Sequence, residues 1–301
     1  MSANTWIVVA DNPAIGNLIE IARSLGGQVS AAVVGPRAVA DTVASGGVDK
    51  VVWFGEPGQA PVEAYASAVA DAVGAASGAV LGASRPSDRV LLGAVAARLQ
   101  APVLTEASSV SADGDGLVAT RTVSGGIAQE TVVIAGPGAI VLDGGPVPAA
   151  SGTAPVDEVA AVPLAMTVVE TNASAFEQVD LGAAHRVVGI GRGLKAQGDL
   201  AMIEALAGAC KAEVACSRPV AEGLDWLGKD RYIGVSGQHL APELYFAIGI
   251  SGQLQHMVGV READTIVAIN SDSNAPVFKE ADYCLVGDLY QIVPALTEAL
   301  R

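Results

Sequence analysis

The most constraining feature of the chain is an unbroken apolar segment, residues 244–250, followed at once by Ser251 and Gly252. Because the segment lacks the polar alternation of a half-exposed strand, it is typical of a parallel strand buried on both faces of a sheet. Residues 265–270 repeat the pattern after one short crossover helix, which is expected to begin at Ser251-Gly252. Unpaired N–H groups and the positive end of that helix dipole favour an anion. The unit therefore predicts a site for a phosphate-bearing ligand.

Length and composition narrow the classes of protein. A chain of 301 residues suggests about two domains, and a hydrophobic content of 51% with 35 Gly provides a large core and many tight turns. The formal net charge is -15, and only 17 Lys and Arg residues are spread along the chain. A nucleic-acid surface needs clustered basic residues, so we expect no nucleic-acid partner.

Cysteine and histidine usage argues against disulfides and metals. Cys210, Cys216 and Cys284 form no CxxC pair, which fits a reducing compartment. The three histidines lack the spacing of a metal site, so no metal is expected. Residues 1–10 lack the basic leader of a signal peptide, and no apolar run approaches the roughly 20 residues of a membrane span. We therefore expect a cytoplasmic protein without direct membrane insertion.

The order of the segments predicts an α/β fold with two domains. A Rossmann-like α/β domain is expected over residues 1–180, followed by a doubly wound parallel-sheet domain over residues 181–301. Late in the first domain the pattern favours antiparallel strands, at residues 117–124, 130–134 and 139–142. A polar stretch at residues 170–180 places the domain boundary near residue 180.

Polar residues follow the candidate strands of the second domain. The six strands are expected at residues 185–191, 213–216, 232–235, 244–250, 265–270 and 283–286. Ligands of a doubly wound sheet bind at the carboxyl ends of its strands. The residues found there are Arg192, Ser217 with Arg218, Ser236 with Gly237, Ser251 with Gly252, Asn270 and Asp288. Taken singly, Asn270 and Asp288 also fit ordinary turns. Together the set predicts a crevice suited to a diphosphate and a polar ring system.

The second half carries a family resemblance. The run of residues 244–259, followed by the motifs Ile-Val-Ala-Ile-Asn at 266–270, Ala-Pro-Val-Phe at 275–278 and Ala-Asp-Tyr at 281–283, resembles the C-terminal motif of electron-transfer flavoprotein alpha subunits. The resemblance covers most of residues 185–301, and the first domain is compatible with it. It implies FAD in the second domain and a cleft completed by a beta subunit in a heterodimer, with the first domain serving subunit assembly.

The resemblance also implies a role. The protein would be an electron carrier without its own substrate turnover, which accepts electrons from flavin dehydrogenases and passes them to an acceptor such as a quinone-linked oxidoreductase. No catalytic residue is expected. Hydrogen bonds to charged groups contribute roughly 1.5 to 3 kcal/mol, or roughly 60 to 130 mV for one electron, so few side chains would set the flavin potential.

Cofactor contacts follow from the resemblance by position. Ser236 would face flavin N5, while Arg218 and His256 would supply positive charge or donors to the N1 and O2 edge. Ser251 would cover the pyrophosphate, and Asn270 and Asp288 would hold the ribityl or adenosine part. The implied cofactor-binding residues are Arg192, Ser217, Arg218, Gly234, Val235, Ser236, Gly237, Ser251, Gly252, Gln253, Leu254, Gln255, His256, Asn270, Asp288 and Leu289.

Some positions depart from the family pattern. Many alpha subunits have Thr-Gly-Lys where this chain has Ser236-Gly237-Gln238, so the hydroxyl is kept but a nearby cation is lost. Ile190 replaces the usual second Gly of the first motif, which affects the approach of Arg192. His239 stands where the family usually has an aliphatic residue, and a turn histidine is expected there.

Two other functions are compatible with part of the pattern. Gly189-Ile190-Gly191-Arg192-Gly193 after a strand suggests an NAD-dependent oxidoreductase, but the third Gly of the usual GxGxxG motif is misplaced. An acidic residue should also end the next strand and bind the ribose, where this chain has Ser217-Arg218. The other alternative is a nucleotide-binding module without redox chemistry, for which a colourless purified heterodimer would be evidence.

Overall fold

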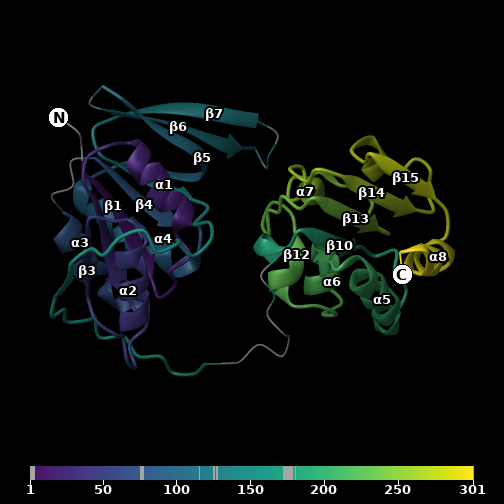
Figure 1. The fold of residues 1–301 in the computed structure, drawn as a ribbon, viewed down its shortest axis with the longest axis horizontal. Coiled ribbons are helices and arrows are strands. Elements are labelled where there is room, and N and C mark those ends of the chain that lie inside the picture. Colours follow the sequence, from purple (N-terminus) through teal and green to yellow (C-terminus); the bar gives the residue numbers. More distant parts are fainter. Residues whose placement is uncertain are drawn as a thin grey trace. The chain divides into compact units, whose positions relative to one another are not determined.

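The computed structural model describes residues 4–74, 78–114, 116–124, 126, 128–171, 179 and 181–300. The chain forms two compact units, Met1–Thr171 and Asn172–Arg301. Each unit is an α/β layer structure dominated by parallel strands, which confirms the predicted fold class (Figure 1). The predicted boundary residue, 180, lies outside the described residues. None of the helices in the described chain combines the length and the apolar character needed to cross a membrane.

The described part of the N-terminal unit holds a nine-stranded sheet in the order β7-β6-β5-β8-β4-β1-β2-β3-β9. The parallel strands are β1 (Thr5–Ala10), β2 (Val29–Val34), β3 (Lys50–Trp53), β4 (Ala79–Ala83), β8 (Gly138–Leu142) and β9 (Val156–Glu158). Antiparallel pairing joins β5 (Val103–Asp113), β6 (Gly116–Val123) and β7 (Ala128–Ala135). The helices are α1 (Gly16–Ser24), α2 (Arg37–Ser45), the 3-10 helix η1 (Val62–Tyr65), α3 (Ala66–Val73) and α4 (Pro86–Leu99).

Strand β8 differs from the sequence prediction. Antiparallel pairing is confirmed for β6 and β7 but is wrong for residues 139–142, because β8 pairs in parallel with both β4 and β5. All residues of β8 are buried, as expected for a central strand covered on both faces. A further strand, β9, lies within residues 149–162, a stretch rich in Ala, Pro and Gly, and extends the sheet at β3.

The C-terminal unit contains a sheet that, in its described residues, has six parallel strands in the order β12-β11-β10-β13-β14-β15. They are β10 (Arg186–Ile190), β11 (Glu213–Ser217), β12 (Tyr232–Ile233), β13 (Leu244–Ile248), β14 (Ile266–Asn270) and β15 (Tyr283–Val286). The helices are η2 (Leu181–Ala183), η3 (Gln197–Asp199), α5 (Leu200–Cys210), α6 (Arg218–Glu222), η4 (Lys229–Arg231), α7 (Leu254–Met257), η5 (Pro276–Lys279) and α8 (Leu289–Ala299). Counted from β10, the order is 3-2-1-4-5-6, which is the doubly wound arrangement predicted.

The two faces of each sheet form separate cores. Because side chains alternate along a strand, Phe246 and Ile248 of β13 pack on one face with α5 and α8, while Tyr245 packs on the other with Met257 of α7. In the N-terminal unit the odd residues of β1 pack with α1 and α2 and the even residues with α3 and α4. Both faces of these strands are apolar, so their polar chemistry is confined to the strand ends.

Candidate functional site

The carboxyl ends of β10, β11, β12 and β13 surround a cavity of about 500 Å³. The sheet order reverses between β10 and β13, and ligands of doubly wound folds bind at such a reversal. The residues that line the cavity are Gly191, Arg192, Ser217, Arg218, Pro219, Tyr232, Ile233, Gly234, Val235, Ser236, Gly249, Ile250, Ser251, Gln253, Gln255 and His256. The cavity therefore lies where the sequence predicts a ligand.

The structure brings most of the predicted site residues to this cavity and leaves others outside it. The predicted residues that line it are Arg192, Ser217, Arg218, Gly234, Val235, Ser236, Ser251, Gln253, Gln255 and His256. Those not among its lining are Gly237, Gly252, Leu254, Asn270, Asp288 and Leu289. Six lining residues are not expected from the sequence to contact a ligand, namely Gly191, Pro219, Tyr232, Ile233, Gly249 and Ile250. Except for Tyr232, which begins β12, they adjoin nominated strand ends, so for the other five residues that position was the available signal.

The loop after β13 is not a helix start. Helix α7 begins at Leu254 and spans four residues, so the predicted helix start at Ser251-Gly252 is wrong. Tight backbone packing shapes this loop instead. Gly252 has a φ of +80°, and a Cβ there would lie 2.0 Å from the backbone nitrogen of Val277. The carbonyl oxygen of Ser251 accepts a hydrogen bond of 3.1 Å from the same nitrogen. Any anion binding at Ser251 therefore depends on the loop rather than on a long helix dipole.

The glycines after β10 and β13 allow two loops to touch. A Cβ on Gly191 would lie 2.3 Å from the carbonyl oxygen of Gly249, and one on Gly193 would lie 2.5 Å from the Cα of Gly249. Gly193 N–H donates a hydrogen bond of 3.1 Å to that same carbonyl. The Gly191-Arg192-Gly193 segment therefore serves close backbone packing at the sheet reversal, and this packing holds the two loops that carry Arg192 and Ser251.

Arg218 provides a cation at the cavity. It is the first residue of α6, and its Nε lies 2.5 Å from Oε2 of Glu222, one turn later. The hydrogen bond from Arg218 lowers the pKa of Glu222, and the Glu222 carboxylate raises the pKa of Arg218. Lys229 Nζ lies 3.9 Å from the other oxygen of Glu222. With 64% of its side chain exposed, Arg218 presents its charge to solvent and to the cavity together.

His256 contributes a neutral imidazole to the cavity wall. Only 8% of the residue is exposed, and its Nε2 lies 2.7 Å from the hydroxyl oxygen of Tyr245. Burial lowers the pKa of His256 to about 4, and a hydrogen-bonding interaction of the ring with the backbone of Ile233 partly opposes the shift. The ring is therefore uncharged near pH 7. Its Nδ1 is buried and, apart from the interaction of the ring with the Ile233 backbone, has no hydrogen-bond partner among the described residues.

Other polar side chains at the cavity also form no hydrogen bonds within the described part of the protein. Within the described chain, no side-chain hydrogen bond to another residue is made by Arg192, Ser217, Ser236, Ser251, Gln253 or Gln255. By contrast, Asn270 donates from Nδ2 to the carbonyl of Ile250 at 2.9 Å, and Asp288 caps α8 by accepting from the nitrogen of Tyr290 at 3.0 Å. The groups available to a ligand are thus concentrated after β10 to β13.

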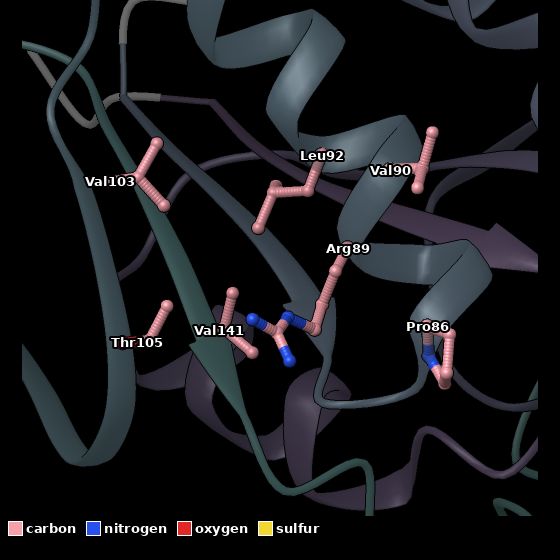
Figure 2. A pocket seen from close by; sticks show the side chains of 7 residues that line it. All are labelled: Pro86, Arg89, Val90, Leu92, Val103, Thr105 and Val141. Carbon is pink, nitrogen blue, oxygen red and sulfur yellow. The ribbon is translucent and has the colours of Figure 1, made fainter.

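A second pocket lies in the N-terminal unit. It has a volume of about 410 Å³ and is lined by Pro86, Arg89, Val90, Leu92, Val103, Thr105 and Val141. Figure 2 shows Arg89 extending from α4 toward Val141 on β8, with Val103 and Thr105 on the neighbouring strand. Its wall is largely apolar, with one cation and one hydroxyl. In the part of the chain that is described, no group of three His, Cys, Asp or Glu residues could hold a metal ion.

Comparisons with known proteins agree with this geometry. Residues 180–261 match the Electron transfer flavoprotein FAD-binding domain, and residues 8–164 match the Electron transfer flavoprotein domain. YdiR of Escherichia coli strain K12, described as an electron transfer flavoprotein subunit, is 59% identical over 131 residues, which cover 44% of this chain and 42% of YdiR. Protein FixB of Escherichia coli O157:H7 is 39% identical over 308 residues, covering 99% of this chain and 98% of FixB. FixB of Salmonella agona is 39% identical with the same coverage.

Proposed function

The chain belongs to the electron transfer flavoprotein alpha-subunit family, and from this membership we propose that it binds FAD in the cavity at the carboxyl ends of β10 to β13. The predicted family and the predicted cofactor are both confirmed, because the matched domain of residues 180–261 is an FAD-binding domain. The placement of the cofactor in the cavity rests on the sheet reversal and on the polar side chains gathered there.

The residues at the cavity fit a flavin dinucleotide. The volume of about 500 Å³ lies in the range of cofactor pockets, and the wall combines apolar surface with a few polar groups. In the described chain the buried Nδ1 of His256 has only the Ile233 backbone to interact with, and a ligand atom in the cavity would supply a further partner. Arg192 and Arg218 add positive charge suited to a diphosphate and to the N1 and O2 edge of a flavin.

The chain would bind and orient the cofactor. When bound, FAD supplies the electron-transfer chemistry itself. Arg218 and Arg192 stabilise negative charge, and the hydroxyls of Ser236 and Ser251 donate hydrogen bonds. His256 acts as a neutral donor, since its lowered pKa removes the positive charge considered from the sequence. Ile233 and Ile250 cover apolar ring surface and exclude water.

The predicted contact residues that do not line the cavity would act in two ways, through packing or through contact with the outer part of the cofactor. Gly237 and Gly252 would act through close backbone packing, since a Cβ at either would collide with Tyr232 or Val277. Asn270 ends β14, and Asp288 with the adjacent Leu289 follows β15. There they would contact the part of the dinucleotide that extends beyond the cavity. Leu254 would support the loop that carries Gln253 and Gln255.

The cellular role follows from family membership. We propose a cytoplasmic electron carrier without its own substrate turnover, which pairs with a beta subunit through the N-terminal domain, with the domain boundary near residue 180. Flavin dehydrogenases would donate electrons, and a quinone-linked oxidoreductase or similar protein would accept them. The description of YdiR as a subunit supports a heterodimer.

The test is the absorbance spectrum of the chain co-produced with its beta subunit. We expect a yellow complex that releases FAD on denaturation, and a Ser251→Phe variant, which fills the cavity, should lose that FAD. Val90→Phe at the N-terminal pocket is the matched control and should retain it. A colourless wild-type complex that also fails to take up added FAD would contradict the proposal and favour the nucleotide-binding module.

A further inference from the structure

We propose that Tyr245 is a positioning residue that fixes the tautomer of His256, so that Nδ1 carries the hydrogen and donates it to the bound cofactor. The donor half of this inference rests on the proposed FAD function. The tautomer half rests on the protein alone.

Tyr245 reaches His256 from inside the sheet. It lies on β13, is completely buried, and its side chain points to the face of the sheet that packs against α7. Its hydroxyl oxygen lies 2.7 Å from Nε2 of His256, and the two ring centroids are 6.2 Å apart. Gly189 on the adjacent strand makes room for it, since a Cβ there would lie 2.0 Å from the hydroxyl oxygen. The hydroxyl therefore has one defined position, against Nε2.

The hydroxyl of Tyr245 keeps its hydrogen and needs an acceptor for it. Burial raises the pKa of Tyr245 well above its usual value, so the phenol stays protonated. Among the described residues, His256 Nε2 is the one hydrogen-bond partner of this hydroxyl. A buried polar hydrogen without an acceptor is destabilising, so donation from Tyr245 to Nε2 is favoured.

Counting unpaired groups selects the tautomer. If Nε2 carried the hydrogen, it would donate to Tyr245, leaving the phenol hydrogen without an acceptor and Nδ1 without a donor. If Nδ1 carries the hydrogen, Tyr245 and Nε2 satisfy each other, and the Nδ1–H group is left with only the Ile233 backbone to interact with in the described chain. The second arrangement leaves fewer buried groups unpaired.

The remaining Nδ1–H group is a donor prepared for an acceptor. His256 lines the cavity, and a flavin offers carbonyl oxygens and ring nitrogens as acceptors. Because Nε2 is occupied by Tyr245, Nδ1 is the nitrogen through which His256 would bind the cofactor. Tyr245 would thus act on the flavin without touching it. Loss of its hydroxyl should change the orientation and the donor character of His256 while the apolar packing of the ring is kept.

The tautomer can be measured directly by ¹⁵N NMR. The full chain, labelled with ¹⁵N-histidine and combined with an unlabelled beta subunit, has three histidines to assign, and a His256→Gln variant identifies the signals of interest. Before FAD is added, we expect Nδ1 of His256 to be protonated and Nε2 to accept. Tyr245→Phe should shift the ring toward the Nε2–H form. Tyr65→Phe, at a buried tyrosine of the N-terminal unit, should leave the spectrum of His256 unchanged.

An FAD titration of the same complexes tests the consequence for the cofactor. Loss of one hydrogen bond should weaken FAD binding roughly threefold to tenfold in Tyr245→Phe, and should lower the flavin midpoint potential. Tyr65→Phe should stay within about twofold of wild type. A wild-type His256 protonated at Nε2 would overturn the proposal, and so would a Tyr245→Phe variant with unchanged tautomer, affinity and potential. If Tyr245→Phe fails to fold, the wild-type spectrum alone decides the tautomer. A wild-type complex that binds no FAD would instead overturn the proposed function and the donor role, while the NMR result would still decide the tautomer.

Discussion

Both units have polar residues after parallel strands. In the N-terminal unit these residues form hydrogen bonds and an ion pair with other groups of the protein. After β4, Arg85 donates to Asp88 at 2.5 Å and to the carbonyls of Ala14 and Asn12 at 3.1 and 3.3 Å. Asp88 is fully buried and also accepts a hydrogen bond of 2.8 Å from the nitrogen of Ala10. These contacts tie the ends of β1 and β4 together. The strand end is thereby stabilised and its charged groups are satisfied.

The C-terminal unit leaves the equivalent groups available. Ser217 ends β11, and Arg192 and Ser251 follow β10 and β13. None of the three makes a side-chain hydrogen bond to any other described residue. A strand end rich in polar residues therefore indicates a ligand site only when the protein itself does not satisfy those residues. The Arg85–Asp88 pair therefore has a structural role, whereas the polar side chains at the cavity are available to bind a ligand.

The largest effect should come from the pair in the N-terminal unit. Asp88→Ala leaves the nitrogen of Ala10 and the guanidinium of Arg85 without their acceptor, and breaking a buried ion pair from one side costs about 3 to 4 kcal/mol. Urea denaturation of the N-terminal unit measures this loss. Asp41→Ala, which removes an exposed ion pair with Arg37, is the control and should cost less than about 1 kcal/mol. Equal effects at the two positions would refute the structural role of Asp88.

Acid should affect the contributions of His256 and Asp88 in opposite directions. The pKa of His256 falls from 6.5 to about 4 on folding because of burial, so the unfolded chain binds a proton first as pH falls. The contribution of His256 to the C-terminal unit should therefore decrease by about 3 kcal/mol between pH 6.5 and pH 4. Burial raises the pKa of Asp88 above 3.8, so the folded chain binds a proton at this carboxylate before the unfolded chain does as pH falls. The contribution of Asp88 to stability therefore decreases as pH rises through its pKa in the folded chain.

Urea unfolding of the chain without FAD at several pH values checks this prediction. The pH dependence of the C-terminal unit between 6.5 and 4 should largely disappear in a His256→Gln variant. A variant with the same pH dependence as wild type would mean that another group titrates in this window.

Arg218 should affect the cofactor more than the fold. Removing a charged hydrogen-bond donor from the cavity should weaken FAD binding by about 2 kcal/mol, roughly thirtyfold, and lower the flavin potential in Arg218→Ala. The melting temperature should change little, because the Arg218–Glu222 pair is exposed. Arg89→Ala in the N-terminal pocket is the matched control. Unchanged FAD binding and potential in Arg218→Ala would remove this residue from the site.

The smallest effect is expected at Asp288, which the protein uses as a helix cap. Asp288→Ala should destabilise the C-terminal unit by about 1 kcal/mol, whereas Asp288→Asn keeps a good cap and should change stability by only a few tenths. Thermal unfolding compares the two variants. If FAD affinity falls in Asp288→Asn at unchanged stability, Asp288 also contacts the cofactor. If both variants bind FAD as wild type does, its role is capping alone.

The sequence was sufficient for the doubly wound sheet, because buried parallel strands are apolar on both faces and their polar residues collect at the ends. It failed for β8, because pairing direction depends on neighbours that are distant in sequence. It failed for the start of α7, because contacts of Gly252 with Val277 shape that loop. Whether a polar side chain forms a hydrogen bond within the protein, as Asn270 does, or forms none, as at Ser217, depends on three-dimensional contacts. For the same reason the Tyr245–His256 pair was not foreseen.

The most direct test of the account is a crystal structure of the chain with its beta subunit and FAD. The flavin is expected in the cavity at the carboxyl ends of β10 to β13, in contact with Arg218, Ser236 and His256. FAD bound elsewhere on the chain, with this cavity filled by rearranged side chains, would contradict it.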